Sequence, residues 1–238
     1  MALSGIEMLV SAEVRWFWRG QHRQPVHDWF FKSGLPPGGG QSRIDRYAPQ
    51  RGKPEISLKR RGNKPEFEVK GFVTTRGISE LEPLATHIEI WCKWSCAIPS
   101  LDLRDEVAVT KTRWLRKFDT SKYVRSEIPL DANEKPKADY LLPLQGCNVE
   151  LTEVEMAGYA ERWWTLGFEA FGNFEGVPTN LTLTVLPEIQ LSESNVVGVI
   201  TLGRVSLNPL RHIDPTILLP GTLASRSTLA VPGTLRLD

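Results

Sequence analysis

The sequence predicts a mainly β fold of the α+β class, in which an antiparallel sheet closes into a barrel accompanied by a few short helices. Roughly seven segments alternate polar and apolar residues with the period of two that strand side chains follow. Several of these segments carry Lys, Arg or Glu along one parity. An open sheet would leave that charged face in bulk water, whereas a barrel can turn it inward around charged, wet contents.

The clearest hairpin spans Glu55 to Gly71. Charged residues, among them Lys59, Arg61 and Lys70, occupy one parity of each strand, and apolar residues take the other. The residues Gly62-Asn63-Lys64-Pro65 supply the turn, because Gly and Asn tolerate positive φ and Pro cannot continue a ladder. The charged face of this hairpin is therefore either wet surface or the lining of a site that holds anions.

The remaining strands are expected at residues 8–16, 42–47, 86–96, 107–115, 128–131, 147–156 and 163–172. In the strand at 147–156 the apolar residues change parity between Leu151 and Val154, which predicts a bulge or a strand end near Thr152. This leaves open whether Glu150 or Glu153 faces the charged side. Residues 181–190 form either a closing helix or another strand.

The chain has 238 residues, of which 41% are hydrophobic, and this suits one large domain with a real core. We expect that domain at residues 1–203, with a flexible insert at about 32–43 that contains Pro and Gly, and a weakly ordered tail at 204–238.

No window approaches about 18 consecutive apolar residues, and Glu7 interrupts the apolar start that a signal peptide needs. A soluble, cytoplasmic protein without a membrane partner is expected. The three cysteines make an odd count with no disulfide framework. Cys92 and Cys96 lie on the apolar parity of one strand, which favours buried thiols over metal ligands.

Charge is distributed unevenly along the chain. Residues 1–125 hold 22 Lys and Arg against 14 Asp and Glu, whereas residues 126–238 hold 7 against 14. This separation suits an anion site whose metal ligands come from later strands. The alternative is that the two halves simply neutralise one another across a sheet.

Six short charged motifs follow one another between about residues 6 and 172. They are Ser11, Glu13 and Arg15; Ile44-Asp45-Arg46-Tyr47; Lys59-Arg60-Arg61; Lys70-Gly71; Lys111-Thr112-Arg113; and Gly146 to Thr152, which contains Glu150. Their order resembles that of the CYTH superfamily of triphosphate tunnel enzymes, whose strands carry the motifs ExExK, YxDxY, RxR, KG, KxR and ExE. Each motif is weak alone, and the order is what carries the resemblance.

The resemblance implies an eight-stranded antiparallel tunnel in which cations bind a triphosphate and glutamates hold Mg²⁺ or Mn²⁺. Members of the family hydrolyse inorganic triphosphate, thiamine triphosphate or RNA 5′-triphosphate ends, and some cyclise ATP. By this resemblance the phosphate-binding residues are Arg15, Lys59, Arg61, Lys70, Lys111 and Arg113. The catalytic residues are Glu13, Lys70 and Arg113. The metal ligands that match the motifs are Glu13 and Glu150, and Glu169 or Asp131 is expected to assist them.

Two positions depart from the family motifs, because Ser11 and Thr152 stand where the family has glutamates. The cationic half of the motif set is therefore more complete than its carboxylate half, and Glu153 or Glu155 is a candidate to compensate. A second hypothesis follows, namely a module that binds polyphosphate without cleaving it. A third, nucleic-acid binding through the basic first half and exposed tryptophans, is disfavoured because the basic residues alternate with apolar ones on strands.

Overall fold

The computed structural model describes residues 8–31, 40–50, 53–77, 87–96 and 106–190. Within these ranges the chain forms nine strands and two helices. The strands are β1 (Met8–Arg19), β2 (Gln41–Ala48), β3 (Ile56–Arg61), β4 (Phe67–Gly77), β5 (His87–Cys96), β6 (Val107–Asp119), β7 (Ser126–Ile128), β8 (Gly146–Met156) and β9 (Arg162–Gly172). The helices are α1 (Gln24–Phe31) and α2 (Val177–Gln190). The predicted mainly β class is confirmed.

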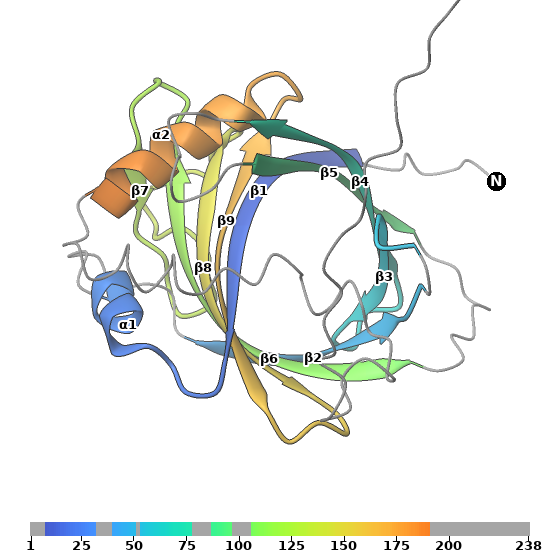
Figure 1. The fold of residues 1–238 in the computed structure, drawn as a ribbon. Coiled ribbons are helices and arrows are strands. Elements are labelled where there is room, and N and C mark those ends of the chain that lie inside the picture. The colour runs from blue at the N-terminus through green and yellow to red at the C-terminus, as the bar shows by residue number, and fades with distance from the viewer. Residues whose placement is uncertain (1–7, 32–39, 51–52, 78–86, 97–105, 191–238) are drawn as a thin grey trace, which may run out of the picture.

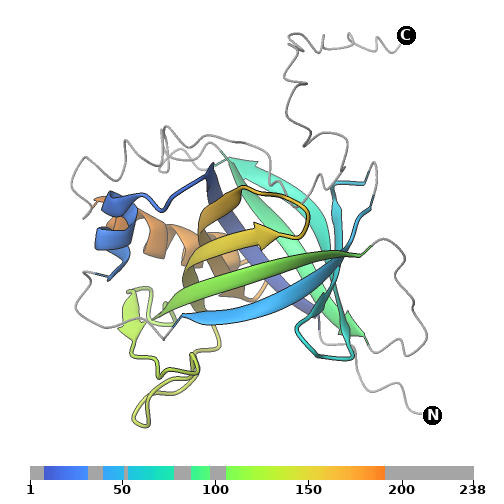
Figure 2. The same ribbon diagram turned by 90° about the horizontal axis from the view of Figure 1, so that it is seen from below.

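Eight of the strands close into an antiparallel barrel, as predicted. Their order is β2-β3-β4-β5-β1-β9-β8-β6, and β6 pairs back with β2 to complete the ring (Figure 1). The short strand β7 pairs with the end of β6 beyond the segment that β2 occupies. Figure 2 shows the same ring from a perpendicular direction, with β2 and β6 running side by side.

The main hydrophobic core lies outside the barrel, between the sheet and the two helices. The outward-facing residues of β1, β8 and β9 are apolar and pack with both helices on one side of the ring (Figure 1). In α2, Val177, Leu181 and Val185 recur at the helical spacing of four residues and are fully buried in this cluster. Alternation along the strands therefore leaves the polar parity facing inward.

A second apolar cluster fills one end of the barrel. It consists of Phe17, Tyr47, Val109, Val154, Met156 and Trp163, all buried. This cluster explains the parity change in β8, which runs without a register shift along both β6 and β9. The predicted bulge near Thr152 is wrong, because the inward face changes from polar to apolar where the strand reaches the cluster. Glu150 faces inward, and Glu153 and Glu155 lie on the opposite parity.

Several sequence-based boundaries need correction. The helix α1 was not predicted, β1 continues past Trp16 to Arg19, and β2 begins at Gln41, inside the expected insert. The open choice at 181–190 is decided in favour of a helix. The rest of the insert and the tail at 204–238 lie outside the described residues.

Other expectations concern single side chains and the membrane. Cys92 and Cys96 are partly exposed, so the expectation of buried thiols there is wrong, while Cys147 is buried; all three are free thiols. All eight tryptophans fall within the described ranges, and each is buried or partly buried, so the exposed tryptophans of the nucleic-acid hypothesis are absent. No helix in the described part of the chain has the length and apolarity needed to cross a bilayer.

Candidate anion site inside the barrel

The inward parity of the barrel carries more basic side chains than carboxylates. The basic residues are Arg15, Arg43, Lys59, Arg61, Lys70, Lys93, Lys111, Arg113 and Lys117. The strand carboxylates on the same parity are Glu13, Asp45, Glu68, Glu89, Asp119, Glu150 and Glu169. Every predicted phosphate-binding residue lies in this set, so strands that are far apart in sequence bring them to one enclosed face.

Next to the apolar end, two lysines surround a buried carboxylate and a phenol. Asp45 is fully buried, and its Oδ2 lies 3.6 Å from Lys59 Nζ and 3.9 Å from Lys111 Nζ. Lys111 Nζ donates a 2.6 Å hydrogen bond to the hydroxyl of Tyr47. Burial alone would raise the pKa of Tyr47, but the charges of Lys111 and Lys59 outweigh it and lower that pKa to about 8. The cluster therefore holds excess positive potential.

The β3–β4 hairpin adds a second group of cations. Lys59 Nζ lies 3.3 Å from Glu68 Oε2, and Arg61 Nη2 donates to the same oxygen at 3.2 Å. One carboxylate thus serves two cations. Burial would raise the pKa of Glu68, but Lys59 and Arg61 hold it below its ordinary value. The side chain of Arg61 is 29% exposed and that of Lys70 is 28% exposed, so solvent reaches this wall of the barrel.

Glu150 is held between two guanidinium groups. Arg15 Nη2 donates to its Oε2 at 3.0 Å, and Arg113 Nη1 donates to its Oε1 at 2.8 Å. Burial favours the neutral acid, but Arg15 and Arg113 outweigh burial and lower the pKa of Glu150 far below its ordinary value. Gly167 makes this arrangement possible, because a Cβ there would stand 2.4 Å from Cζ of Arg15.

Three carboxylates lie side by side across neighbouring strands. Glu13 on β1 pairs in register with Glu89 on β5 and with Glu169 on β9. Ser11 Oγ donates to Glu13 at 2.7 Å, and Lys70 Nζ donates to the same oxygen. Burial raises the pKa of Glu13, but Lys70 and Arg15 lower it by more, so the carboxylate is ionised. Like charges placed directly opposite one another repel, and the cationic side chains of Lys70 and Arg15 offset this repulsion at Glu13.

Sequence reasoning missed Glu134, which a loop delivers to the barrel. Its carboxylate binds Arg113 through two contacts, Nε to Oε1 at 3.3 Å and Nη2 to Oε2. The side chain is only 8% exposed. Nothing in the sequence pattern signals this role, because the residue belongs to no strand and its position depends on how the loop folds.

Asp131, a predicted metal ligand, begins the same loop. Its Oδ1 accepts hydrogen bonds from the backbone N–H groups of Asn133 and Lys135, at 2.8 and 2.9 Å. The hydrogen bond from Lys135 is the main cause of its lowered pKa. The Asp131 carboxylate thus shapes a turn.

The carboxylates inside the barrel meet only part of what the Mg²⁺ or Mn²⁺ implied by the resemblance requires. Within the described residues, no group of three or more His, Cys, Asp or Glu side chains is arranged to hold a metal ion. Both oxygens of Glu150 are bound by arginines. Glu13 and Glu169 lie directly opposite each other. Mg²⁺ is commonly held by one or two carboxylates together with waters and substrate phosphates, so this pair fits a cation that arrives with a polyphosphate.

The sequence-based prediction also assigned no role to Asp45, Tyr47, Glu68 and Glu89. The alternation that located the lysines contained the signal for Glu68 and Glu89, because each shares the parity of a basic residue on its own strand. Asp45 and Tyr47 belong to a quoted motif, but only the fold shows that both contact Lys111.

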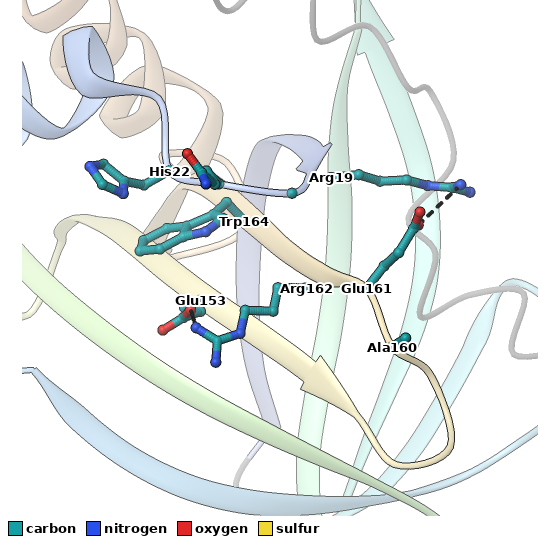
Figure 3. Close-up of a pocket in the computed structure, with 9 residues that line it drawn as sticks. Arg19, His22, Glu153, Ala160, Glu161, Arg162 and Trp164 are labelled. Atoms are coloured by element: carbon teal, nitrogen blue, oxygen red, sulfur yellow. Dashed lines mark hydrogen bonds and ion pairs between the residues drawn. The ribbon is translucent and has the colours of Figure 1, made fainter.

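A separate hollow of about 600 Å³ lies on the outer surface, where the β1–α1 connection meets the β8–β9 hairpin (Figure 3). Trp164 lines it together with charged residues. Arg162 donates to Glu153 at 3.0 Å, and Arg19 lies 3.4 Å from Glu161. Its charged groups thus pair with one another. Of the residues considered for the site from the sequence, only Glu153, a candidate to compensate for the missing glutamates, lines this hollow.

The residues themselves establish a closed barrel with an enclosed, predominantly cationic face. Membership of the CYTH superfamily stays a prediction drawn from the order of the motifs. In comparisons with protein-family models and with curated proteins, nothing matched this chain.

Proposed function

We propose that this protein binds a triphosphate inside its barrel and hydrolyses it with Mg²⁺ or Mn²⁺, acting on inorganic triphosphate or a small organic or nucleoside triphosphate. A cytoplasmic setting is part of the proposal. The observation that supports it most is the excess of Lys and Arg over carboxylates on one enclosed face. Buried charge without compensation is costly, and a polyphosphate is a compact anion that would compensate several cations at once.

The distribution of these cations suits a chain of phosphoryl groups. Lys59 and Lys111 lie around Asp45, next to the end of the barrel that the second apolar cluster fills. Arg15 and Arg113 lie around Glu150. Lysines supply mobile point charges, while arginines offer planar pairs of N–H donors that match phosphoryl oxygens. The two kinds of cation would hold different phosphoryl groups of one ligand in a fixed order.

For hydrolysis, Glu13 and Glu169 would hold the divalent ion. When bound, this ion would lower the pKa of a coordinated water and neutralise phosphoryl charge. Lys70 donates to Glu13 in the present arrangement, and it would turn to a phosphoryl oxygen when triphosphate is bound. Arg113 would stabilise the charge that develops on the transferred phosphoryl group.

The enzymatic part is tested by measuring phosphate release from inorganic triphosphate and from nucleoside triphosphates with Mg²⁺ or Mn²⁺. We expect Glu13→Gln to lower the rate by at least about 100-fold, because it removes a charged ligand and leaves the side chain volume nearly unchanged. Glu161→Gln is the matched control, since Glu161 is exposed in a surface ion pair outside the barrel. Release by the wild type no faster than by a Glu13→Ala variant would sink the claim of hydrolysis.

One observation favours binding without cleavage as a second candidate function. Glu150 is occupied by two arginines, so the carboxylate wall offers fewer free ligands than the resemblance implies. A thermal-shift titration separates the two functions. Stabilisation by triphosphate that is the same with and without a divalent ion, in a protein that releases no phosphate, identifies a binding module.

A further inference from the structure

We propose that Glu134 occupies a phosphoryl subsite at Arg113, so that a triphosphate must displace this carboxylate and its loop before it can bind fully. The inference rests on the proposed function and adds that a group of the protein competes with triphosphate for Arg113. The competitor is a side chain of the protein itself, delivered by residues 131–136 between β7 and β8.

The donors of Arg113 are already committed. Nε and Nη2, which form the side of the guanidinium that matches two oxygens of one group, are bound to Glu134. Nη1 is bound to Glu150. A phosphoryl group therefore cannot make its usual paired contacts with Arg113 while Glu134 stays in place.

The loop is built to hold Glu134 in this position. Glu134 has φ of 60°, a left-handed conformation that is unfavourable for a non-glycine residue. The backbone N–H of Glu134 donates to Asp131 O at 3.1 Å, and Asp131 N donates to Lys135 O at 2.8 Å. The carboxylate of Asp131 accepts two further backbone hydrogen bonds within the turn.

The loop also lies against the barrel at the level of Arg113. Gln41 on β2 pairs in register with Arg113, and its Nε2 donates to Ala132 O at 3.2 Å. Apart from this contact and the ion pair of Glu134, the turn residues from Ala132 to Lys135 are mostly exposed. Leu130, buried with Leu115 and Ile128, anchors the base of the loop, so an anion that competes for Arg113 would displace only the tip that carries Glu134.

The experiment compares triphosphate affinity of the full chain by calorimetry for the wild type, Glu134→Gln and Glu134→Gly. Glycine suits the positive φ, so the second variant removes the carboxylate while favouring the turn. We expect both variants to bind inorganic triphosphate on the order of tenfold more tightly, since an anionic competitor is gone. Glu161→Gln makes the same change of charge outside the barrel and should leave the affinity unchanged.

The outcomes separate this inference from the function on which it rests. Equal affinity of wild type and both variants overturns the inference and leaves triphosphate binding standing. Weaker binding by the variants also overturns it, because Glu134 would then orient Arg113 for the ligand. If neither the wild type nor the variants bind triphosphate, the proposed function fails and the inference fails with it.

Discussion

Tyr47 and Lys111 illustrate how single residues respond to the enclosed positive potential. Lys111 donates to the Tyr47 hydroxyl, and Lys59 lies 5.7 Å from the centre of the same ring. Burial lowers the pKa of Lys111, and only part of this effect is offset by Tyr47. The Tyr47 phenol and the Lys111 ammonium therefore both have pKa values below their ordinary ones.

This cluster predicts a particular dependence of stability on pH. The pKa of Tyr47 is about 8 in the folded protein against an ordinary value of 10.0, so between these pH values the unfolded chain binds more protons. Stability contributed by Tyr47 should rise from pH 8 to pH 10, by about 2 kcal/mol, and be lost as pH falls through 8. Urea unfolding at several pH values measures it.

The matched variants for this prediction are Tyr47→Phe and Tyr123→Phe. Tyr47→Phe should lack the rise in stability between pH 8 and pH 10, because no phenol remains to ionise. Tyr123 is 78% exposed, and its substitution should leave the pH profile as it is in the wild type. A Tyr47→Phe profile that coincides with that of the wild type would contradict the account.

At the scale of elements, a buried ion network attaches α2 to the sheet. The side chain of Arg116 on β6 is only 1% exposed, and it binds Glu188 on α2 at 2.9 Å and Glu127 on β7 at 2.7 Å. Glu188 also pairs with Arg125. Removing one partner of a buried charge is costly, because the remaining charge keeps its desolvation penalty.

We therefore expect Glu188→Ala to lower the free energy of unfolding by about 2–3 kcal/mol. Glu127 continues to compensate Arg116 in this variant, which keeps the loss below the full cost of an isolated buried cation. Chemical denaturation of wild type, Glu188→Ala and Glu161→Ala measures the difference. Glu161 is an exposed control, and its loss should cost less than about 1 kcal/mol. Equal losses in the two variants would show that the buried network stabilises the fold no more than an exposed ion pair does.

Elements with strict alternation were predictable, and those that depend on tertiary context were not. The strand pattern located β1–β6, β8 and β9, because alternation is a local property of the sequence. The helix α1 contains Trp29, Phe30 and Phe31 instead of strong helix formers, and it gains its stability by packing on the outer face of the barrel. The parity change in β8 was misread because the second apolar cluster forms only when the barrel closes.

The candidate site divides in the same way. Strand positions such as Glu13, Lys59 and Lys111 were found because their parity is visible in the sequence. Glu134 was not found, because it lies in a loop and contacts Arg113, which is 21 residues away in the sequence. The local sequence gives no indication of where such a loop residue points. Contacts of this kind depend on the whole fold, and no periodic pattern of polar and apolar residues in the sequence predicts them.

In the whole molecule, charged side chains line the inside of the barrel and apolar side chains cover part of its outside, the reverse of a globular protein with an apolar centre. The main apolar core lies between the sheet and its helices, and the barrel encloses charge. Since cations exceed carboxylates on the inner face, anion binding and folding should be coupled. A triphosphate at 100 times its dissociation constant would stabilise the fold by about 2.7 kcal/mol, which corresponds to a rise in Tm of roughly 5–10 °C.

The most direct test is calorimetric titration of inorganic triphosphate into wild type, Lys59→Gln and Lys64→Gln. Both lysines belong to the β3–β4 hairpin, but Lys59 faces the barrel interior and Lys64 is exposed in the turn. Binding inside the barrel predicts that Lys59→Gln weakens the affinity by about tenfold or more and that Lys64→Gln leaves it nearly unchanged. Absence of binding by the wild type, or equal effects of the two substitutions, would contradict a triphosphate site within the barrel.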